Sequence, residues 1–245
     1  MADDTSAPIP FTVRRATLGD EHAWEQFTQR WGSFLQSWRW GELRRESGWQ
    51  PVRFLAERDG ALAGLIQGLY RRFYSSIAFV YVPRGPTVRD EAALIPLLEA
   101  VVREAQRLRA WFVRLEPELP QGHALGAQLT TAGWRSVPFH TQLPHTVRVD
   151  LRPDEATVLM SFRQTWRRFI RQATARSVTV REGTAADLPR FSALERETAE
   201  RQHILGRSLA YYERFWRHFA DHGARLWLAE SEGLLLGALL VLEWA

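Results

Sequence analysis

Residues 54–64 read Phe-Leu-Ala-Glu-Arg-Asp-Gly-Ala-Leu-Ala-Gly, and residues 227–237 read Trp-Leu-Ala-Glu-Ser-Glu-Gly-Leu-Leu-Leu-Gly. Each stretch has two apolar runs around a two-residue turn that ends in glycine, which is the pattern of a β-hairpin. An earlier pair keeps the same order: residues 12–17 read Thr-Val-Arg-Arg-Ala-Thr and residues 179–184 read Thr-Val-Arg-Glu-Gly-Thr, each followed three positions later by aspartate. The period is far longer than that of a solenoid repeat, so we predict two copies of one domain fold.

The first copy alternates predicted strands and helices. We expect strands at 12–15, 51–57, 61–72, 77–82 and 111–115, with residues 146–151 also extended, and helices at 20–30, 36–46, 91–109 and one ending at 132. This order predicts an α/β arrangement with a mixed sheet. It matches the layout of the GNAT (acyl-CoA N-acyltransferase-like) fold.

The copies also set the expected domain boundaries. We predict a loose tail at 1–10, a first GNAT-like domain at 11–150, a basic helical insertion at 151–177 and a second GNAT-like domain at 178–245. The second copy should hold a long helical stretch to about residue 219, followed by its hairpin. From Thr12 to Thr146 the first copy takes about 135 residues, whereas 67 remain from Thr179, so we expect a second domain that is incomplete at its C-terminus.

Composition excludes several classes of protein. The chain has 45% hydrophobic residues and no cysteine, which indicates a globular fold without disulfides or thiolate metal sites. Its N-terminus is acidic rather than apolar, and no run approaches the roughly 20 apolar residues of a membrane span. We therefore expect a cytoplasmic protein. All 32 basic residues are arginine, but a net charge of +4 does not by itself indicate a nucleic-acid partner.

No motif indicates a metal or a cofactor. The seven histidines show no metal-ligand spacing, and the sequence contains no nucleophile elbow, Walker A motif or dinucleotide fingerprint. We expect neither a metal site nor a bound cofactor.

The predicted insertion contains the densest group of arginines. Arg163, Arg167 and Arg171 recur every four residues on one helical face, with Arg168 beside them. Stacked like charges cost a few tenths of a kcal/mol per pair, which an anionic partner would offset. The alternative is an ordinary solvated face in an arginine-rich chain.

Five groups of residues form a longer pattern. They are Phe34-Leu35-Gln36-Ser37 with Trp40-Gly41-Glu42-Leu43-Arg44 and Gly48-Trp49; Tyr81-Val82-Pro83-Arg84-Gly85-Pro86 with Asp90; Thr146-Val147 with Val149-Asp150-Leu151; Phe162 with Thr165-Trp166-Arg167-Arg168, Ile170-Arg171 and Ala173; and Ser208 with Tyr211-Tyr212. Together, over roughly residues 12–245, they resemble the FemAB family, the peptidoglycan-bridge peptidyltransferases related to lipid II:glycine glycyltransferase.

The resemblance implies an aminoacyltransferase with two GNAT-like domains and a cleft between them. Such an enzyme moves an amino acid from aminoacyl-tRNA to the stem peptide of a peptidoglycan precursor, either UDP-MurNAc-peptide or lipid II. Peripheral contact with the membrane surface is also expected, without a transmembrane segment. The family uses a basic residue late in its second domain, beyond the last residue here, so the activity of this chain by itself stays open.

The match implies that five positions contact the precursor or lie in the cleft: Arg44, where Arg45 fits almost as well, Asp90, Thr165, Arg167 and Tyr212. The chemistry of the transfer adds Tyr81, Arg84, Arg163, Arg168 and Arg171, which gives ten candidate residues. Asp90 and Tyr212 are the catalytic candidates, while Arg163, Arg168 and Arg171 would contact phosphate or the tRNA. The candidates for substrate binding are Arg44, Tyr81, Arg84, Thr165 and Arg167.

The residues themselves leave alternatives open. Asp90 could hold the incoming ammonium, take its proton, or cap the helix that follows. Tyr81 and Tyr212 could orient substrate or simply pack. Arg84 precedes Gly85-Pro86, and since proline lacks the amide donor that coenzyme A would need, acyl-CoA use is disfavoured. The rival functions are an N-acyltransferase with another donor and a non-catalytic muropeptide-binding module. The sequence does not specify the transferred amino acid, the acceptor position or the oligomeric state.

Overall fold

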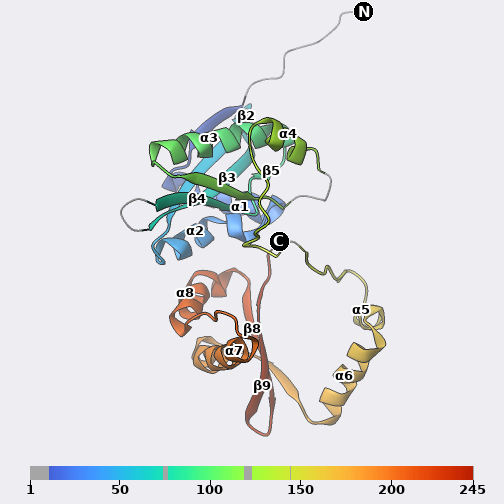
Figure 1. The fold of residues 1–245 in the computed structure, drawn as a ribbon. Coiled ribbons are helices and arrows are strands. Elements are labelled where there is room, and N and C mark those ends of the chain that lie inside the picture. Colours follow the sequence, from blue (N-terminus) through green and yellow to red (C-terminus); the bar gives the residue numbers. More distant parts are fainter. Residues whose placement is uncertain (1–10, 74–76, 119–122, 144, 245) are drawn as a thin grey trace, which may run out of the picture. The chain divides into compact units, whose positions relative to one another are not determined.

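The computed structural model describes residues 11–73, 77–118, 123–143 and 145–244, so the predicted tail at 1–10 lies outside the described residues. The described chain forms two compact units, one of residues 11–143 with Trp244 and one of residues 145–243 (Figure 1). In the part of the chain that the structure describes, no helix has both the length and the apolar composition of a membrane span.

The first unit is built on a sheet in the order β1-β2-β3-β4-β6, with β5 paired to β3. Its strands are antiparallel except for the parallel pair β4 and β6. The strands are β1 (Thr12–Arg15), β2 (Gln50–Arg58), β3 (Ala61–Phe73), β4 (Ile77–Pro83), β5 (Thr87–Val88) and β6 (Phe112–Glu116). The helices are α1 (Glu21–Trp31), α2 (Trp38–Arg45), α3 (Leu94–Arg107) and α4 (Leu125–Thr131), with short 3-10 turns η1 (Leu18–Asp20), η2 (Phe34–Gln36) and η3 (Glu91–Ala93).

Helices cover both faces of this sheet (Figure 1). The apolar side of α3 packs on one face, where Val101 joins Ile66 and Val80 in a buried cluster. Alternate residues of the strands point the other way, and Leu65 there packs with Trp24, from α1. The sheet is therefore fixed from both sides, and its strand ends are held in place.

The second unit contains a smaller, antiparallel sheet in the order β7-β8-β9. Its core consists of Leu188, Phe191, Tyr212, Leu226 and Leu228. The elements are α5 (Glu155–Ser161), α6 (Gln164–Ala175), β7 (Thr179–Glu182), η4 (Ala185–Asp187), α7 (Leu188–Gln202), α8 (Leu209–Phe219), η5 (Ala220–His222), β8 (Ala224–Ser231) and β9 (Leu234–Leu242).

The sequence repeat is a repeat of structure. In both copies the first strand pairs antiparallel with the second, and the hairpin carries a register shift at the Ala-Glu step, Ala56/Glu57 in one and Ala229/Glu230 in the other. Each copy also has an arginine triad, defined as one strand arginine that pairs with two carboxylates. The triads are Arg14 with Asp20 and Glu57, at 2.7 and 2.9 Å, and Arg181 with Asp187 and Glu230, at 2.6 and 2.8 Å.

The structure differs from the predictions in several local details. The strand β5 was not predicted. The helix expected at 36–46 is divided at Ser37, whose side chain caps α2 by accepting from the Trp40 amide. The long helical stretch is divided into α7 and α8, because His203 takes a left-handed conformation with φ 54° and ends α7. Residues 146–151 join no sheet among the described strands.

Candidate functional site

The parallel strands β4 and β6 end at one edge of the first sheet. Pro83 lies opposite Glu116, and the next amide, from Arg84, donates to the Glu116 carbonyl at 2.7 Å. In open α/β sheets, ligands bind outside the carboxyl ends of the strands. This edge is therefore the candidate site of the first unit.

A carboxylate organises the edge. Glu116 accepts hydrogen bonds from the Tyr81 hydroxyl at 2.7 Å, from Arg114 Nη2 at 2.7 Å, and from the amides of Thr141 and Gln142 at 2.8 and 2.9 Å. The Gln142 side chain also donates to the Tyr81 hydroxyl, at 3.0 Å. Tyr81 thus donates and accepts within the protein, and the segment around residue 141 is fastened to both strand ends.

The protonation states follow from these contacts. Burial, with the nearby Glu116 carboxylate adding to it, raises the pKa of Tyr81 far above its usual value, so the phenol stays protonated. Burial alone would raise the pKa of Glu116, but the hydrogen bonds from the Thr141 amide, Tyr81 and Arg114 outweigh it and lower the pKa to about 2. Neither group is a suitable base at neutral pH. Their role at this edge is to fix positions.

Arg84 brings a cation to the edge on a constrained backbone. Its φ of 51° lies in the left-handed region, which a non-glycine residue rarely adopts. Its Nη2 donates to the Leu143 carbonyl at 2.9 Å, and no carboxylate pairs with it among the described residues. A half-buried guanidinium with spare donors can bind an anion such as phosphate or carboxylate.

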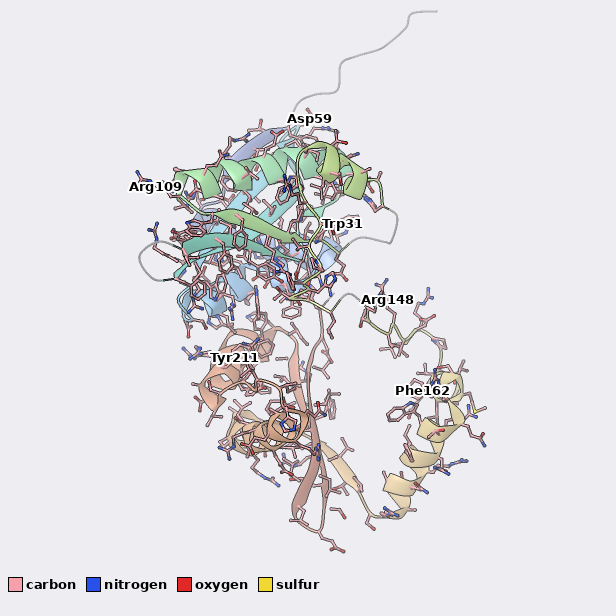
Figure 2. All side chains as sticks on the ribbon, viewed as in Figure 1. Trp31, Asp59, Arg109, Arg148, Phe162 and Tyr211 are labelled. Carbon is pink, nitrogen blue, oxygen red and sulfur yellow. The ribbon has the colours of Figure 1, made fainter. Side chains whose placement is uncertain are left out.

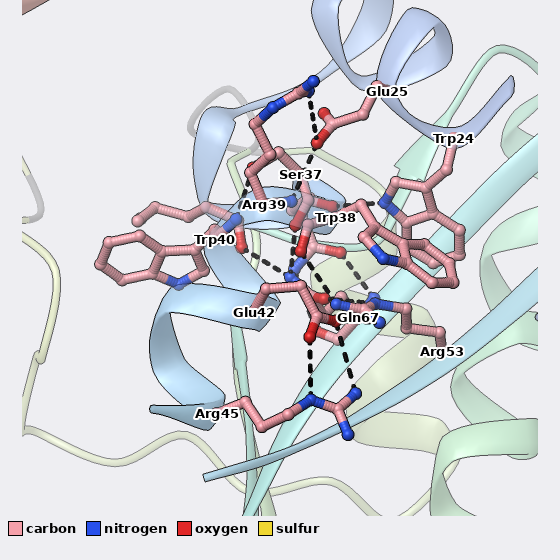
Figure 3. A network of polar contacts seen from close by, with 12 residues as sticks. Trp24, Glu25, Ser37, Trp38, Arg39, Trp40, Glu42, Arg45, Arg53 and Gln67 are labelled. Atoms are coloured by element: carbon pink, nitrogen blue, oxygen red, sulfur yellow. Dashed lines mark hydrogen bonds and ion pairs between the residues drawn. The ribbon is translucent and has the colours of Figure 1, made fainter. Parts of the chain in front are cut away.

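A buried polar network lies behind this edge, between α2 and the sheet (Figure 3). The Arg53 guanidinium pairs with Glu42 at 2.9 Å, donates to the Gln67 side chain at 2.7 Å and to the Trp38 carbonyl at 2.9 Å. Burial lowers the pKa of Arg53 to about 10, with Glu42 opposing the shift. Arg53 remains charged, and its neighbours compensate the charge.

Arg44 lies elsewhere in the first unit. Its guanidinium stacks on Trp40 and Trp49, 5.6 and 5.2 Å from the ring centroids. Such stacking holds a cation at an aromatic surface. Its predicted role in substrate binding stays a prediction.

Asp90 acts as a helix cap. One carboxylate oxygen accepts from the Ala92 amide at 3.0 Å, and the other pairs with Arg58 at 2.6 Å. Its amide contacts the Ala63 carbonyl at the hairpin end of β3, whereas Tyr81 pairs with Leu69, further along that strand. The capping interpretation is confirmed. The structure does not bring Asp90 into the Tyr81–Glu116 cluster, and its predicted catalytic role is untested.

Tyr212 belongs to the core of the second unit. It donates to Glu195 at 3.3 Å, and burial together with that carboxylate raises its pKa to about 12. It lines a cavity of about 370 Å³ that also includes Arg207 and Tyr211. Its predicted catalytic role is untested, and a protonated phenol at neutral pH could act there as a hydrogen-bond donor.

The basic helix forms, but in two pieces. Phe162 ends α5, and α6 begins after Arg163 (Figure 2). Arg167 does not extend freely, because its Nη1 donates to the carbonyls of Met160 and Phe162 at 2.8 and 3.0 Å. Arg168 stacks on Phe169, and Thr165 is exposed on the first turn of α6. Arg163, Arg168 and Arg171 are exposed and have no ion-pair partner among the described residues.

Two of the predicted residues, Tyr81 and Arg84, therefore come together at one edge. Sequence reasoning missed Glu116, Arg114 and Gln142, which surround them. The position of Glu116 could have indicated it, because this carboxylate stands at the end of a predicted strand and directly before a proline.

Residues 20–232 match the FemAB family, which is most of the sequence. The chain belongs to the FemAB family. This FemAB chain is 26% identical over 214 residues to a protein named lipid II:glycine glycyltransferase in Staphylococcus haemolyticus (strain JCSC1435) and equally so to its namesake in Staphylococcus aureus (strain MRSA252). Each match covers 82% of this chain and 51% of the relative, so the chain spans about half the length of these curated relatives.

The fold agrees with the family assignment. The crystal structure of FemX aligns with 89% of this chain and 57% of its own, with a TM-score of 0.75 at 23% sequence identity. The predicted fold class, an α/β protein of two tandem sheet-containing units, is confirmed. Among the described strands, however, only the sheet of the first unit is mixed.

Proposed function

We propose that this FemAB chain takes part in transferring an amino acid from aminoacyl-tRNA to the stem peptide of a peptidoglycan precursor. Family membership and the relatives named lipid II:glycine glycyltransferase support this assignment. The chain spans half the length of those relatives, so the donor, the acceptor and the complete reaction all belong to the proposal.

The reaction asks for positioning more than for acid–base power. The amine of the stem peptide attacks the ester carbonyl of the aminoacyl-tRNA. A C–N bond forms, the C–O bond to the ribose breaks, and the proton lost by the amine ends on the ribose hydroxyl. The ester is already activated, so orientation can supply several kcal/mol of the barrier reduction. A site with a protonated Tyr81 and a weakly basic Glu116 suits this chemistry.

Arg84 is the observation on which the proposal rests. A guanidinium can bind a diphosphate through paired hydrogen bonds, and both UDP-MurNAc-peptide and lipid II carry one. Arg84 presents such a guanidinium at the carboxyl ends of β4 and β6, where the Glu116 carbonyl fixes its backbone. The exposed arginines of α6 and its N-terminus, Arg163, Arg168 and Arg171, are the candidates for contact with the tRNA.

The test removes the guanidinium without straining the backbone. Glycine adopts a positive φ freely, so Arg84→Gly should keep the loop while deleting the cation. Hydrogen bonds to charged groups contribute about 1.5–3 kcal/mol, so the affinity for UDP-MurNAc-pentapeptide, measured by calorimetry, should fall at least tenfold.

The matched control is Arg109→Gly. Arg109 has a φ of 55° and lies after α3, outside the candidate site (Figure 2). Its substitution should leave the affinity unchanged. An equal loss in both variants, or none in Arg84→Gly, would remove Arg84 from the site. Transfer with charged tRNA then separates the rival functions: turnover of acyl-CoA alone would favour an N-acyltransferase, and binding without transfer a muropeptide-binding module.

A further inference from the structure

The strand β3 has a gap on the side that faces β4. It pairs with β4 from Leu69 onward and with β5 at Gly64 and Leu65, which leaves Gln67 between the two pairings. Its main-chain N–H and C=O are buried and need partners. Neither β4 nor β5 supplies these partners.

The side-chain amide of Gln36 fills this gap. Its Oε1 accepts from the Gln67 amide at 2.8 Å, and its Nε2 donates to the Gln67 carbonyl at 3.1 Å. One primary amide therefore makes both hydrogen bonds that a neighbouring strand residue would make. Gln36 is fully buried, so these bonds do not compete with water.

The same amide holds the loop that carries Arg84. The second hydrogen of Nε2 bonds the Pro83 carbonyl at 2.7 Å, directly before Arg84. Directly after Arg84, a Cβ added to Gly85 would lie 2.4–2.6 Å from the amide atoms of Gln36. The loop on both sides of Arg84 is thus seated against one side chain.

Gln36 itself is anchored from several directions. Its carbonyl accepts from the Trp24 indole at 2.7 Å, and the Gln67 side chain donates to the Ser37 carbonyl at 2.8 Å. Gln67 in turn accepts from Arg53. The buried polar network of Figure 3 therefore continues to the loop through Gln36.

We propose that Gln36 is a positioning residue that sets the place of Arg84 by tying Pro83 to β3. As an account of substrate binding, this rests on the proposed function. As an account of the loop, it stands on the hydrogen bonds alone.

Gln36→Met is the direct test, because methionine has a similar length but cannot bridge the three main-chain groups. Precursor affinity, measured on folded protein by calorimetry with UDP-MurNAc-pentapeptide, should fall at least tenfold. If Gln36 acts through Arg84, Gln36→Met should cause no further loss in an Arg84→Gly background. Additive losses, or an unchanged affinity in Gln36→Met, would overturn the proposal.

A stability control separates positioning from general damage. Leu98→Ala truncates a buried side chain of α3 in the same unit, and should lower the urea midpoint while leaving affinity unchanged. If Leu98→Ala weakened binding as much as Gln36→Met, the effect would be one of stability and the proposal would fail.

If the wild type binds no precursor, the proposed function is refuted, but the positioning role of Gln36 is not. A structural measurement then tests that role. In a crystal structure of Gln36→Met, residues 83–85 should have moved from their wild-type place, and Gly85→Ala should move the same residues. A loop that is unchanged in Gln36→Met would overturn the positioning role.

Discussion

The two copies share a backbone but differ in what they bury at one equivalent position. In the first copy the Ala16 amide donates to the Arg53 carbonyl at 3.0 Å, and in the second the Gly183 amide donates to the Leu226 carbonyl at 2.7 Å. Arg53 is 5% exposed and lies within a polar network, whereas Leu226 is fully buried among apolar residues. Equivalent strands, β2 in the first copy and β8 in the second, therefore support a charged core in one copy and an apolar core in the other.

The difference separates fold from function. The second copy shows that an apolar side chain suffices to build this part of the scaffold. A buried charge is costly, and replacing a buried ion pair with apolar residues is often neutral or stabilising. The first copy keeps the costly arrangement, and its hydrogen bonds lead through Gln67 and Gln36 to the loop that carries Arg84.

Replacing Arg53 with the residue of the second copy should cause the largest loss in the free energy of unfolding. Arg53→Leu places a leucine where the second copy has one, but it leaves the Gln67 side chain and the Trp38 carbonyl without their donor. Each buried acceptor left without its donor costs about 1–3 kcal/mol, so the two acceptors together should cost about 2–6 kcal/mol. Urea denaturation at pH 7 should show a loss of that size.

The control uses another arginine on the same acid. Arg45 pairs with Glu42 at 2.9 Å but is 57% exposed, so Arg45→Leu should cost less than about 1 kcal/mol. Equal costs for Arg53→Leu and Arg45→Leu would mean that the buried network adds nothing beyond a surface ion pair.

The arginine triads test the shared part of the scaffold. The usual pKa of an aspartate is near 3.8. Hydrogen bonds from Arg14 and Arg181 hold the pKa values of Asp20 and Asp187 far below it. A lowered pKa stabilises the fold above the unfolded pKa, and this stabilisation is lost as the pH falls below about 4. The arginines of the two triads are 39% and 42% exposed, so solvent screening limits the effect of Asp20→Asn or Asp187→Asn to about 1 kcal/mol at pH 7.

The measurement is the free energy of unfolding of each variant at pH 7 and pH 3. The difference from wild type should be similar for the two variants and should shrink at the lower pH. Asp59→Asn is the control, because Asp59 has no ion-pair partner among the described residues. A large effect in one triad and none in the other would contradict their equivalence.

The sequence predicted the features that depend on residues close together in the chain, namely turns, helix starts and strands. Asp59-Gly60 and Glu232-Gly233 specify hairpins because both turn positions need a positive φ, and Asp90 marks the start of the helical region that contains α3. The first strands and their order followed from apolar runs between such signals. The breaks at Ser37 and His203 were missed because the apolar pattern continues through them.

The site was predictable only in part, because its chemistry depends on distant partners. Tyr81 and Arg84 could be found at the end of a predicted strand. The partner of Gln36 lies 31 residues away, and the amide of Thr141 lies 25 residues from Glu116. No local pattern reports such pairings, so the buried network and the lowered pKa of Glu116 required the structure.

The hairpin turns offer the smallest and most local comparison between the copies. Asp59 and Glu232 take φ values of 53° and 50°, each before a glycine with positive φ, as in a type I′ turn. Aspartate and asparagine tolerate this conformation better than glutamate does. Glu232→Asn should therefore raise the free energy of unfolding of the second unit by about 0.5 kcal/mol.

Glu232→Gln removes the same charge without changing the turn preference, and Asp59→Glu should weaken the first hairpin by a similar amount. Amide hydrogen exchange in β8 and β9 can resolve effects of this size, because it reports local opening within one unit. If Glu232→Asn and Glu232→Gln slow exchange equally, the gain comes from charge rather than backbone conformation. In that case the two hairpins differ in electrostatics, and turn residues are not what distinguishes the copies at this position.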